Sequence, residues 1–205
     1  DVKVFVDFHR AQRALIGEKS HNGNVGMYRE MSRTYKHQIE LLGVPVKSRE
    51  LFGVLHLKGS VFDDMVFYTG ASLNNVYLHH EDRFRCDRYH MMESRKLADI
   101  MVDYLENNLV NSPAVQPLNG DKIPGISDIK ASIRILKKEL NSAKYHFSHE
   151  TPGENQIGIT PLTGFGRKNN SLNITILNLM RSTSSEITLL TPYFNLPYVL
   201  LKEVR

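Results

Sequence analysis

Residues 52–75 read FGVLHLKGSVFDDMVFYTGASLNN and combine a strand-like apolar pattern with polar interruptions. The interruptions are His56, Lys58 and Asp63. An unpaired charge inside a buried strand is energetically costly. The stretch is therefore either an ordinary strand whose polar residues face water or a strand that carries a reactive site.

The spacing of the first two polar residues favours a site for an anion. Side chains two residues apart on a strand point to the same face, so His56 and Lys58 are expected to share a face, opposite Leu55 and Leu57. A lysine supplies a point charge to a phosphate oxygen. A histidine can act as nucleophile or proton carrier near neutral pH.

The second half of the stretch predicts a hairpin that returns to the same place. Asp63 and Asp64 separate two apolar segments, and aspartate is favoured in turns. The returning strand ends at Gly70, where the backbone can approach a ligand closely. Ser72 and Asn74 follow and can donate hydrogen bonds to that ligand.

The pattern His56-x-Lys58-x(4)-Asp63-x(6)-Gly70 resembles the HKD motif of the phospholipase D superfamily. The continuation GASLN is one residue longer than the usual Gly-Ser-x-Asn. With HLKG, DD and NNVYLHHEDRFRCDRYH around it, this longer form is similar to the bacterial phosphatidylserine synthases of that superfamily. The segments VKVFVDFHRAQR and TLLTPYFNLP extend the resemblance over most of the chain.

The resemblance implies a phosphatidyltransferase that uses CDP-diacylglycerol and L-serine. A histidine attacks the diphosphate, a phosphatidyl-histidine forms, and serine then takes the phosphatidyl group; CMP is the leaving product. No cofactor and no metal ion are implied. His56 is expected as nucleophile or acid and Lys58 as the phosphate-holding group, with Asp63 in the motif as a brace for the hairpin.

The remaining site residues are also implied by the resemblance. Gly70, Ser72 and Asn74 are expected to bind phosphate or substrate, and Asp87 is the candidate that orients the histidine. Sites of this superfamily use two HKD motifs, and no other histidine of this chain has a lysine two positions on. The second motif is expected from residues outside the given sequence or from another subunit.

The alternation of strand and helix patterns predicts an α/β or α+β fold with a mixed sheet. The resemblance implies a phospholipase D-like sheet flanked by helices, in two similar halves, with the chain truncated at both ends. Residues 1–110 are the expected first half, 111–128 a linker or loop rich in proline and glycine, and 129–205 the start of the second half, without its motif. Expected helices cover residues 26–42, 97–109, 128–147 and 171–179, and expected strands cover 2–8, 44–51, 88–92 and 186–194.

Charge and hydropathy favour an anionic partner and a peripheral location. The net charge is +4 with a pI of about 9.1, and no apolar run approaches the roughly 20 residues that span a bilayer. The expected helix 128–147 has an apolar stripe and a basic remainder, which suits either an anionic membrane surface or an ordinary packed helix. Because the substrate that the resemblance implies is a lipid, a cytoplasmic, peripherally membrane-associated protein is expected.

Other functions share the motif. One alternative is a cardiolipin-synthase-like transferase or a phospholipase D-type phosphodiesterase; another is a nuclease, which predicts salt-sensitive DNA binding, although nucleic acid is the less favoured partner. A third is a catalytically inactive protein that binds lipid or partners through its basic helix. The segment HHEDRFRCDRYH is interpreted as a charged turn and not as a metal site, because no metal-ligand spacing is met.

Overall fold

A computed structural model describes residues 1–13, 23–35, 38–46, 55–80, 82–165, 170–189, 196 and 198–204 of the chain. The chain divides into two compact units, Asp1–Glu139 and Leu140–Arg205. The described residues form helices and two three-stranded sheets, which confirms the expected mixed α/β class.

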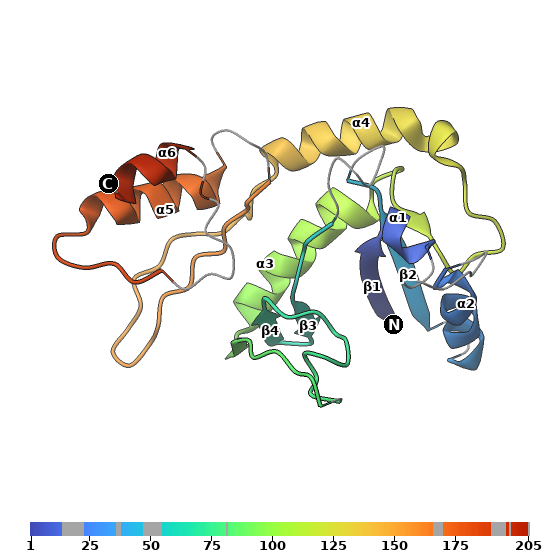
Figure 1. The fold of residues 1–205 in the computed structure, drawn as a ribbon, viewed down its shortest axis with the longest axis horizontal. Coiled ribbons are helices and arrows are strands. Elements are labelled where there is room, and N and C mark those ends of the chain that lie inside the picture. The colour runs from blue at the N-terminus through green and yellow to red at the C-terminus, as the bar shows by residue number, and fades with distance from the viewer. Residues whose placement is uncertain are drawn as a thin grey trace. The chain divides into compact units, whose positions relative to one another are not determined.

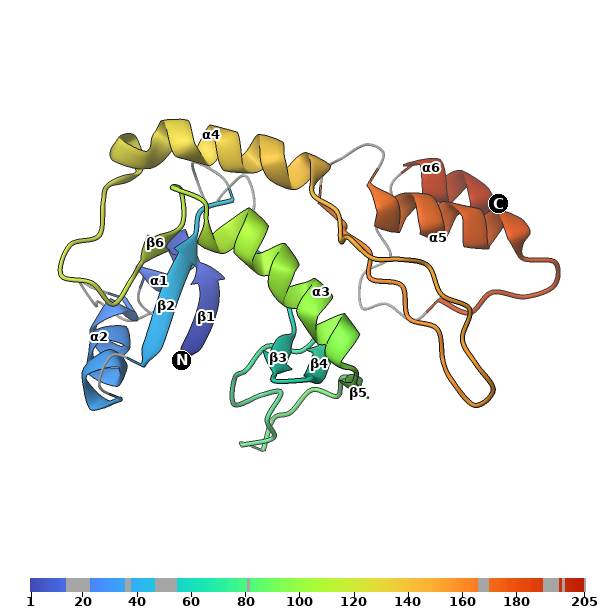
Figure 2. The same ribbon diagram turned by 180° about the vertical axis from the view of Figure 1, so that it is seen from behind.

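The first sheet has the strand order β1-β2-β6 (Figure 2). Strands β1 (Val2–Asp7) and β2 (Ile39–Val44) are parallel, in register from Val2 opposite Ile39 to Asp7 opposite Val44. The short strand β6 (Gln116–Pro117) runs antiparallel to β2. Helices α1 (Phe8–Ala11) and α2 (Val25–Thr34) lie between β1 and β2 in the sequence. Because β1 and β2 are parallel, their carboxyl ends meet at one edge of the sheet.

The core of this sheet is packed tightly at Gly43. Leu41, Leu42 and Val44 of β2 are buried, as are Phe8 and Leu118. A Cβ atom added at Gly43 would lie 2.9 Å from a ring carbon of Phe8 and 2.9 Å from a methyl carbon of Leu118. Glycine at this position therefore allows the two large side chains to close over the sheet.

The second sheet is antiparallel, in the order β3-β4-β5. Its strands are β3 (Ser60–Phe62), β4 (Met65–Thr69) and β5 (Tyr89–Glu93), so the hairpin and the strand after it are confirmed. Helix α3 (Arg95–Leu105) lies along β3 and β4 (Figure 1) and continues into the π-helical segment η2 (Glu106–Val110). The core between helix and sheet comprises Val66, Leu97 and Ala98, with Val61, Met92 and Met101 packed against it.

Helix α4 (Ile126–Ser142) begins in the first unit and ends in the second. The second unit further contains α5 (Ser171–Ser182), α6 (Tyr198–Leu201) and the 3-10 turn η3 (Lys202–Val204). Asn170 caps α5 by accepting a hydrogen bond from the amide of Asn173 at 2.8 Å. Arg181 of α5 pairs with Glu203 at 2.9 Å.

Several sequence predictions of secondary structure were wrong in part. The helix predicted over 26–42 ends at Thr34, and Ile39–Val44 form β2 because they pair along their whole length with β1. The strand predicted over 44–51 is absent at residues 45–46, and residues 47–51 lie outside the described residues. The strand predicted over 186–194 is absent at 186–189, and its remaining residues also lie outside the described part.

The segment predicted as a linker contributes to the first unit. Ala114, Val115 and Leu118 are buried, and β6 pairs with β2 in the same segment. The boundary between compact units lies after Glu139, further along the chain than the predicted linker over 111–128. Proline and glycine here mark a surface connection that returns to the sheet.

The packing at Gly43 generates a paired stability prediction. Gly43→Ala should lower the free energy of unfolding by about 1–3 kcal/mol, because the added methyl group overpacks the core. Gly26→Ala in helix α2, where no atom lies within 4 Å of the added carbon, should raise it by roughly 0.4–1 kcal/mol. Urea unfolding of both variants and the parent measures this; equal effects of the two substitutions would contradict the packing described at Gly43.

Candidate active site

The segment that carries the predicted histidine is anchored by a buried carboxylate at the end of β1. Asp7 is only 8% exposed. Its Oδ2 accepts a hydrogen bond from the amide of Leu55 at 2.7 Å, and its Oδ1 accepts from the amides of His9 at 3.0 Å and Arg10 at 2.9 Å. The residue before His56 is thus held at the carboxyl edge of the parallel pair β1–β2, the side of α/β sheets where ligands usually bind.

The predicted strand begins later than expected. Residues 55–59 are not part of a strand, and β3 starts at Ser60. Gly59 has a φ of +118°, a conformation that L side chains rarely adopt, and it separates the motif segment from β3. His56 is exposed and Lys58 is half-buried, so the imidazole is accessible to a ligand.

Lys58 and Ser72 meet across the hairpin. The ammonium Nζ of Lys58 donates a hydrogen bond to Oγ of Ser72 at 2.6 Å. The two residues are 14 apart in the sequence, and β3 and β4 bring them together. A cation and a hydroxyl in contact form a place where a phosphoryl oxygen can be bound by both groups.

Asp63 lies at the other end of the hairpin. It is exposed and has a φ of 53°, as the tight turn between β3 and β4 requires. Strand pairing runs from Phe62 opposite Met65 back to Ser60 opposite Phe67, so the turn is the end remote from Lys58 and Gly70. The structure thus places Asp63 where a bracing role was predicted and does not bring it to His56.

Gly70 lies against the carboxylate of Asp87. A Cβ atom at Gly70 would be 3.2 Å from Oδ2 and 3.4 Å from Oδ1 of Asp87. The loop that carries Asp87 folds back through hydrogen bonds from the Arg85 amide to the Val76 carbonyl at 3.0 Å and from the Tyr89 hydroxyl to the Tyr77 carbonyl at 3.3 Å. Asp87 therefore lies beside Gly70, another of the predicted site residues.

The carboxylate of Asp87 accepts a hydrogen bond from the Arg88 amide at 2.7 Å. Within the described residues, no hydrogen bond joins it to His56. Its predicted role of orienting the histidine is not realised in this arrangement and stays a prediction.

Asn74 is used within its own turn. Its Oδ1 accepts a hydrogen bond from the amide of Tyr77 at 3.2 Å, and its side chain is exposed. The strand end before it is ordered by Thr69, whose buried Oγ1 accepts from the Ala71 amide at 3.0 Å. Of the three predicted phosphate-binding residues, the structure brings Ser72 to Lys58 and Gly70 to Asp87, and leaves Asn74 in a local turn.

Sequence reasoning missed Asp7. An aspartate directly after an apolar strand and before a short helix is a usual N-cap, and this signal was present in VDFHR. The contact with Leu55, 48 residues away, had no local signal.

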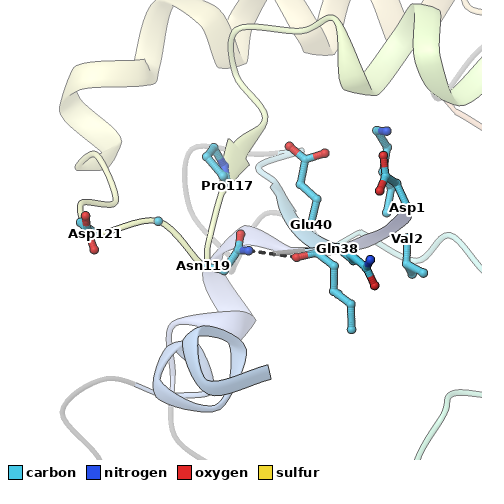
Figure 3. A pocket seen from close by; sticks show the side chains of 10 residues that line it. Asp1, Val2, Gln38, Glu40, Pro117, Asn119 and Asp121 are labelled. Atoms are coloured by element: carbon cyan, nitrogen blue, oxygen red, sulfur yellow. Dashed lines mark hydrogen bonds between the residues drawn. The ribbon is translucent and has the colours of Figure 1, made fainter. Parts of the chain in front are cut away.

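A cavity of about 450 Å³ lies at the opposite end of the first sheet (Figure 3). It is lined by the starts of β1 and β2, by the end of β6 and by residues after it, among them Val2, Glu40, Pro117 and Asn119. Asn119 donates to the carbonyl of Ile39 at 3.1 Å there. The cavity contains none of the predicted site residues.

Metal-binding groups and membrane-spanning helices were sought in the described part of the chain. No three His, Cys, Asp or Glu side chains among the described residues are grouped so that they could hold a metal ion. Over the same ranges, no helix has the length and apolarity needed to cross a membrane.

Known proteins were compared with the chain. The chain is 43% identical over 205 residues to the CDP-diacylglycerol–serine O-phosphatidyltransferase PssA of Escherichia coli K12, and 39% identical over 208 residues to the enzyme of that name from Haemophilus influenzae Rd. The predicted resemblance to phosphatidylserine synthases is confirmed. The crystal structure of phosphatidylserine synthase from Haemophilus influenzae Rd KW20 superimposes with a TM-score of 0.90 at 40% sequence identity.

Each comparison matches the whole of this chain but only part of the relative. The chain spans 45% and 46% of the two curated relatives and 46% of the crystallised chain, about half of their length. No protein-family model matches the chain.

The contact between Lys58 and Ser72 generates a prediction about energetic coupling. Lys58→Met and Ser72→Ala should be non-additive in the free energy of unfolding, by about 1 kcal/mol, because a hydrogen bond with a charged partner contributes on this scale. A double-mutant cycle by urea unfolding measures it. As a control, Lys58→Met combined with Ser182→Ala, whose hydroxyl bonds within its own helix, should be additive; an additive Lys58–Ser72 pair would show that the contact has no energetic weight.

Proposed function

We propose that this chain carries one HKD half-site of a phosphatidyltransferase that makes phosphatidylserine and CMP from CDP-diacylglycerol and L-serine. The observation that carries the proposal is the Lys58–Ser72 contact beside an exposed His56. The similarity of the whole of this chain to about half of two proteins named for this reaction supports the choice of substrates.

The chemistry follows from the groups present. In the proposed reaction a histidine nitrogen bonds to the phosphorus of the phosphatidyl group as the phosphate oxygen of CMP leaves, giving phosphatidyl-histidine. The serine hydroxyl then attacks that phosphorus and the histidine is released. His56 acts as this nucleophile or as the acid that protonates the leaving CMP.

Charge stabilisation is assigned to the lysine and its partner. The ammonium of Lys58 and the hydroxyl of Ser72 are already in contact, so both can donate to the phosphoryl oxygens as their negative charge develops. Gly70, without a side chain, allows the carboxylate of Asp87 to lie against the backbone at this position. Asp63 braces the hairpin turn and has no proposed contact with substrate.

We further propose that the complete site is formed by two phospholipase D-like halves, each of which contributes one HKD motif. Residues 1–110 form the first phospholipase D-like half, and residues from 129 onward begin the second. The second HKD motif comes from residues outside the given sequence or from another subunit.

Membrane contact is proposed through the basic side of α4, in a cytoplasmic protein that associates peripherally. The apolar stripe of this helix is buried at Ile129, Ile133, Leu136 and Leu140, so it is not free to insert into a bilayer. The exposed side carries Lys130, Arg134, Lys137 and Lys138. Their spacing of three or four residues between successive turns places them on one face of the helix. Their positive charge can attract anionic headgroups.

The first test is CMP release from CDP-diacylglycerol in mixed micelles by the natural protein that carries this chain. Release is expected to depend on L-serine. His56→Ala should reduce it by roughly 10³-fold or more, because the phosphatidyl transfer loses its nucleophile or acid. His149→Ala, which removes an exposed histidine of the second unit, should leave the rate unchanged.

Three outcomes would contradict the proposal. CMP release that is unaffected by His56→Ala would remove this residue from the chemistry. Release that does not respond to serine would indicate a phospholipase or a transferase with another acceptor. DNA cleavage that weakens steeply with salt would indicate the nuclease alternative.

A second test concerns the membrane. Replacement of Lys130, Arg134 and Lys137 by glutamine should weaken binding to vesicles containing phosphatidylglycerol by at least about tenfold, because each basic residue near an anionic surface contributes about 1 kcal/mol. Vesicle co-sedimentation measures the affinity. A control makes the same charge change at Lys3 of β1, Arg33 of α2 and Lys122 of the segment before α4, all of them exposed. This control should lose clearly less affinity; an equal loss would mean that net charge, and not helix α4, attracts the membrane.

A further inference from the structure

The carboxylate of Asp7 connects two separate structural features through its two oxygens. Oδ1 accepts the amides of His9 and Arg10 and so caps α1. Oδ2 accepts the amide of Leu55 at 2.7 Å, the shortest of the three bonds. An ionised carboxylate only accepts hydrogen bonds, and three backbone donors suit its two oxygens.

The bond to Leu55 is a long-range one next to the reactive residue. Leu55 directly precedes His56, and 48 residues separate it from Asp7. The residues from 55 to 59 are not held by strand pairing. The Asp7 contact and the Lys58–Ser72 contact therefore hold this segment on either side of His56.

We infer that Asp7 is a positioning residue for the reaction: its Oδ2 fixes the backbone from which the imidazole of His56 extends. The inference rests on the proposed function, since it assigns His56 to the chemistry. A displacement of about 1 Å at a reacting group can cost about 10²-fold in rate. Release of the Leu55 amide would allow such a displacement without removing any group that touches substrate.

The two oxygens can be tested separately. Asparagine caps helices as well as aspartate does, but its amide has one accepting oxygen, and its NH₂ group cannot accept from Leu55. Asp7→Asn should therefore keep the cap on α1 and lose the bond to Leu55. Asp7→Ser is the second variant, because a serine hydroxyl also caps a helix but is too short to accept from the Leu55 amide. It covers the case in which the single amide oxygen of Asn at position 7 accepts from Leu55 instead of capping α1.

Steady-state CMP release by the natural protein gives the first readout. Both variants should lower kcat by about 10- to 100-fold while the KM values for CDP-diacylglycerol and serine stay within about twofold, because the binding groups are untouched. Asp128→Asn is the control, since its carboxylate also accepts a backbone amide, that of Gly125 at 3.0 Å, at the start of α4. The control should keep the kcat of the parent even where its melting temperature falls as much as that of the Asp7 variants.

Two readouts need no turnover. In the Asp7 variants the amide of Leu55 should exchange its hydrogen at least about tenfold faster by NMR, because a native hydrogen bond slows exchange. The rate at which diethyl pyrocarbonate modifies His56 should also change, while that of His149 should not.

The outcomes separate this inference from the proposed function. Parent-like kcat in both variants, or unchanged exchange at Leu55, would overturn the role of Asp7. The role of Asp7 would also be overturned if kcat fell only in proportion to the loss of melting temperature and recovered when the assay was cooled. If the parent releases no CMP, the proposed function fails, and faster Leu55 exchange with altered His56 modification would still support the positioning by Asp7.

Discussion

A single buried carboxylate joins the end of β1 and the start of α1 to a segment 48 residues further along the chain. Asp7 ends β1, caps α1 and accepts the amide of Leu55. Removing a charge from water is costly unless hydrogen bonds satisfy it, and three backbone donors do so here. The parallel pairing of β1 with β2 places this carboxylate at the edge of the sheet where the segment of His56 arrives, so the location of the candidate site follows from it.

From that anchor, one hairpin builds the rest of the site. The chain leaves the sheet edge, turns at Asp63 and returns to Gly70 and Ser72, where Ser72 meets Lys58. Helix α3 supports the hairpin from one face through the core around Val66. His56 and Lys58 lie before β3, exposed and half-buried respectively, while apolar positions of β3 and β4 supply the packing against α3. This answers how an apolar stretch can include His56 and Lys58.

The same separation of apolar and charged surfaces applies to α4. Its apolar stripe is buried in the protein, and its basic residues are exposed on another face. A packed helix of this kind can attract an anionic surface without inserting into it, since attraction to headgroups requires charge and not apolar area. The chain matches about half of the length of each relative.

The sequence by itself determined the features that depend on local periodicity and spacing. These are the hairpin between β3 and β4, strand β5, the amphipathic helices α3 and α4, and the motif His56-x-Lys58 with its resemblance to phosphatidylserine synthases. Only the tertiary structure decided that residues 39–44 pair as a strand, that 114–118 join the core, that Asn74 serves its own turn and that Asp7 holds Leu55. An apolar period predicts which face is buried, but it does not name the distant partner that covers the face or satisfies a buried donor.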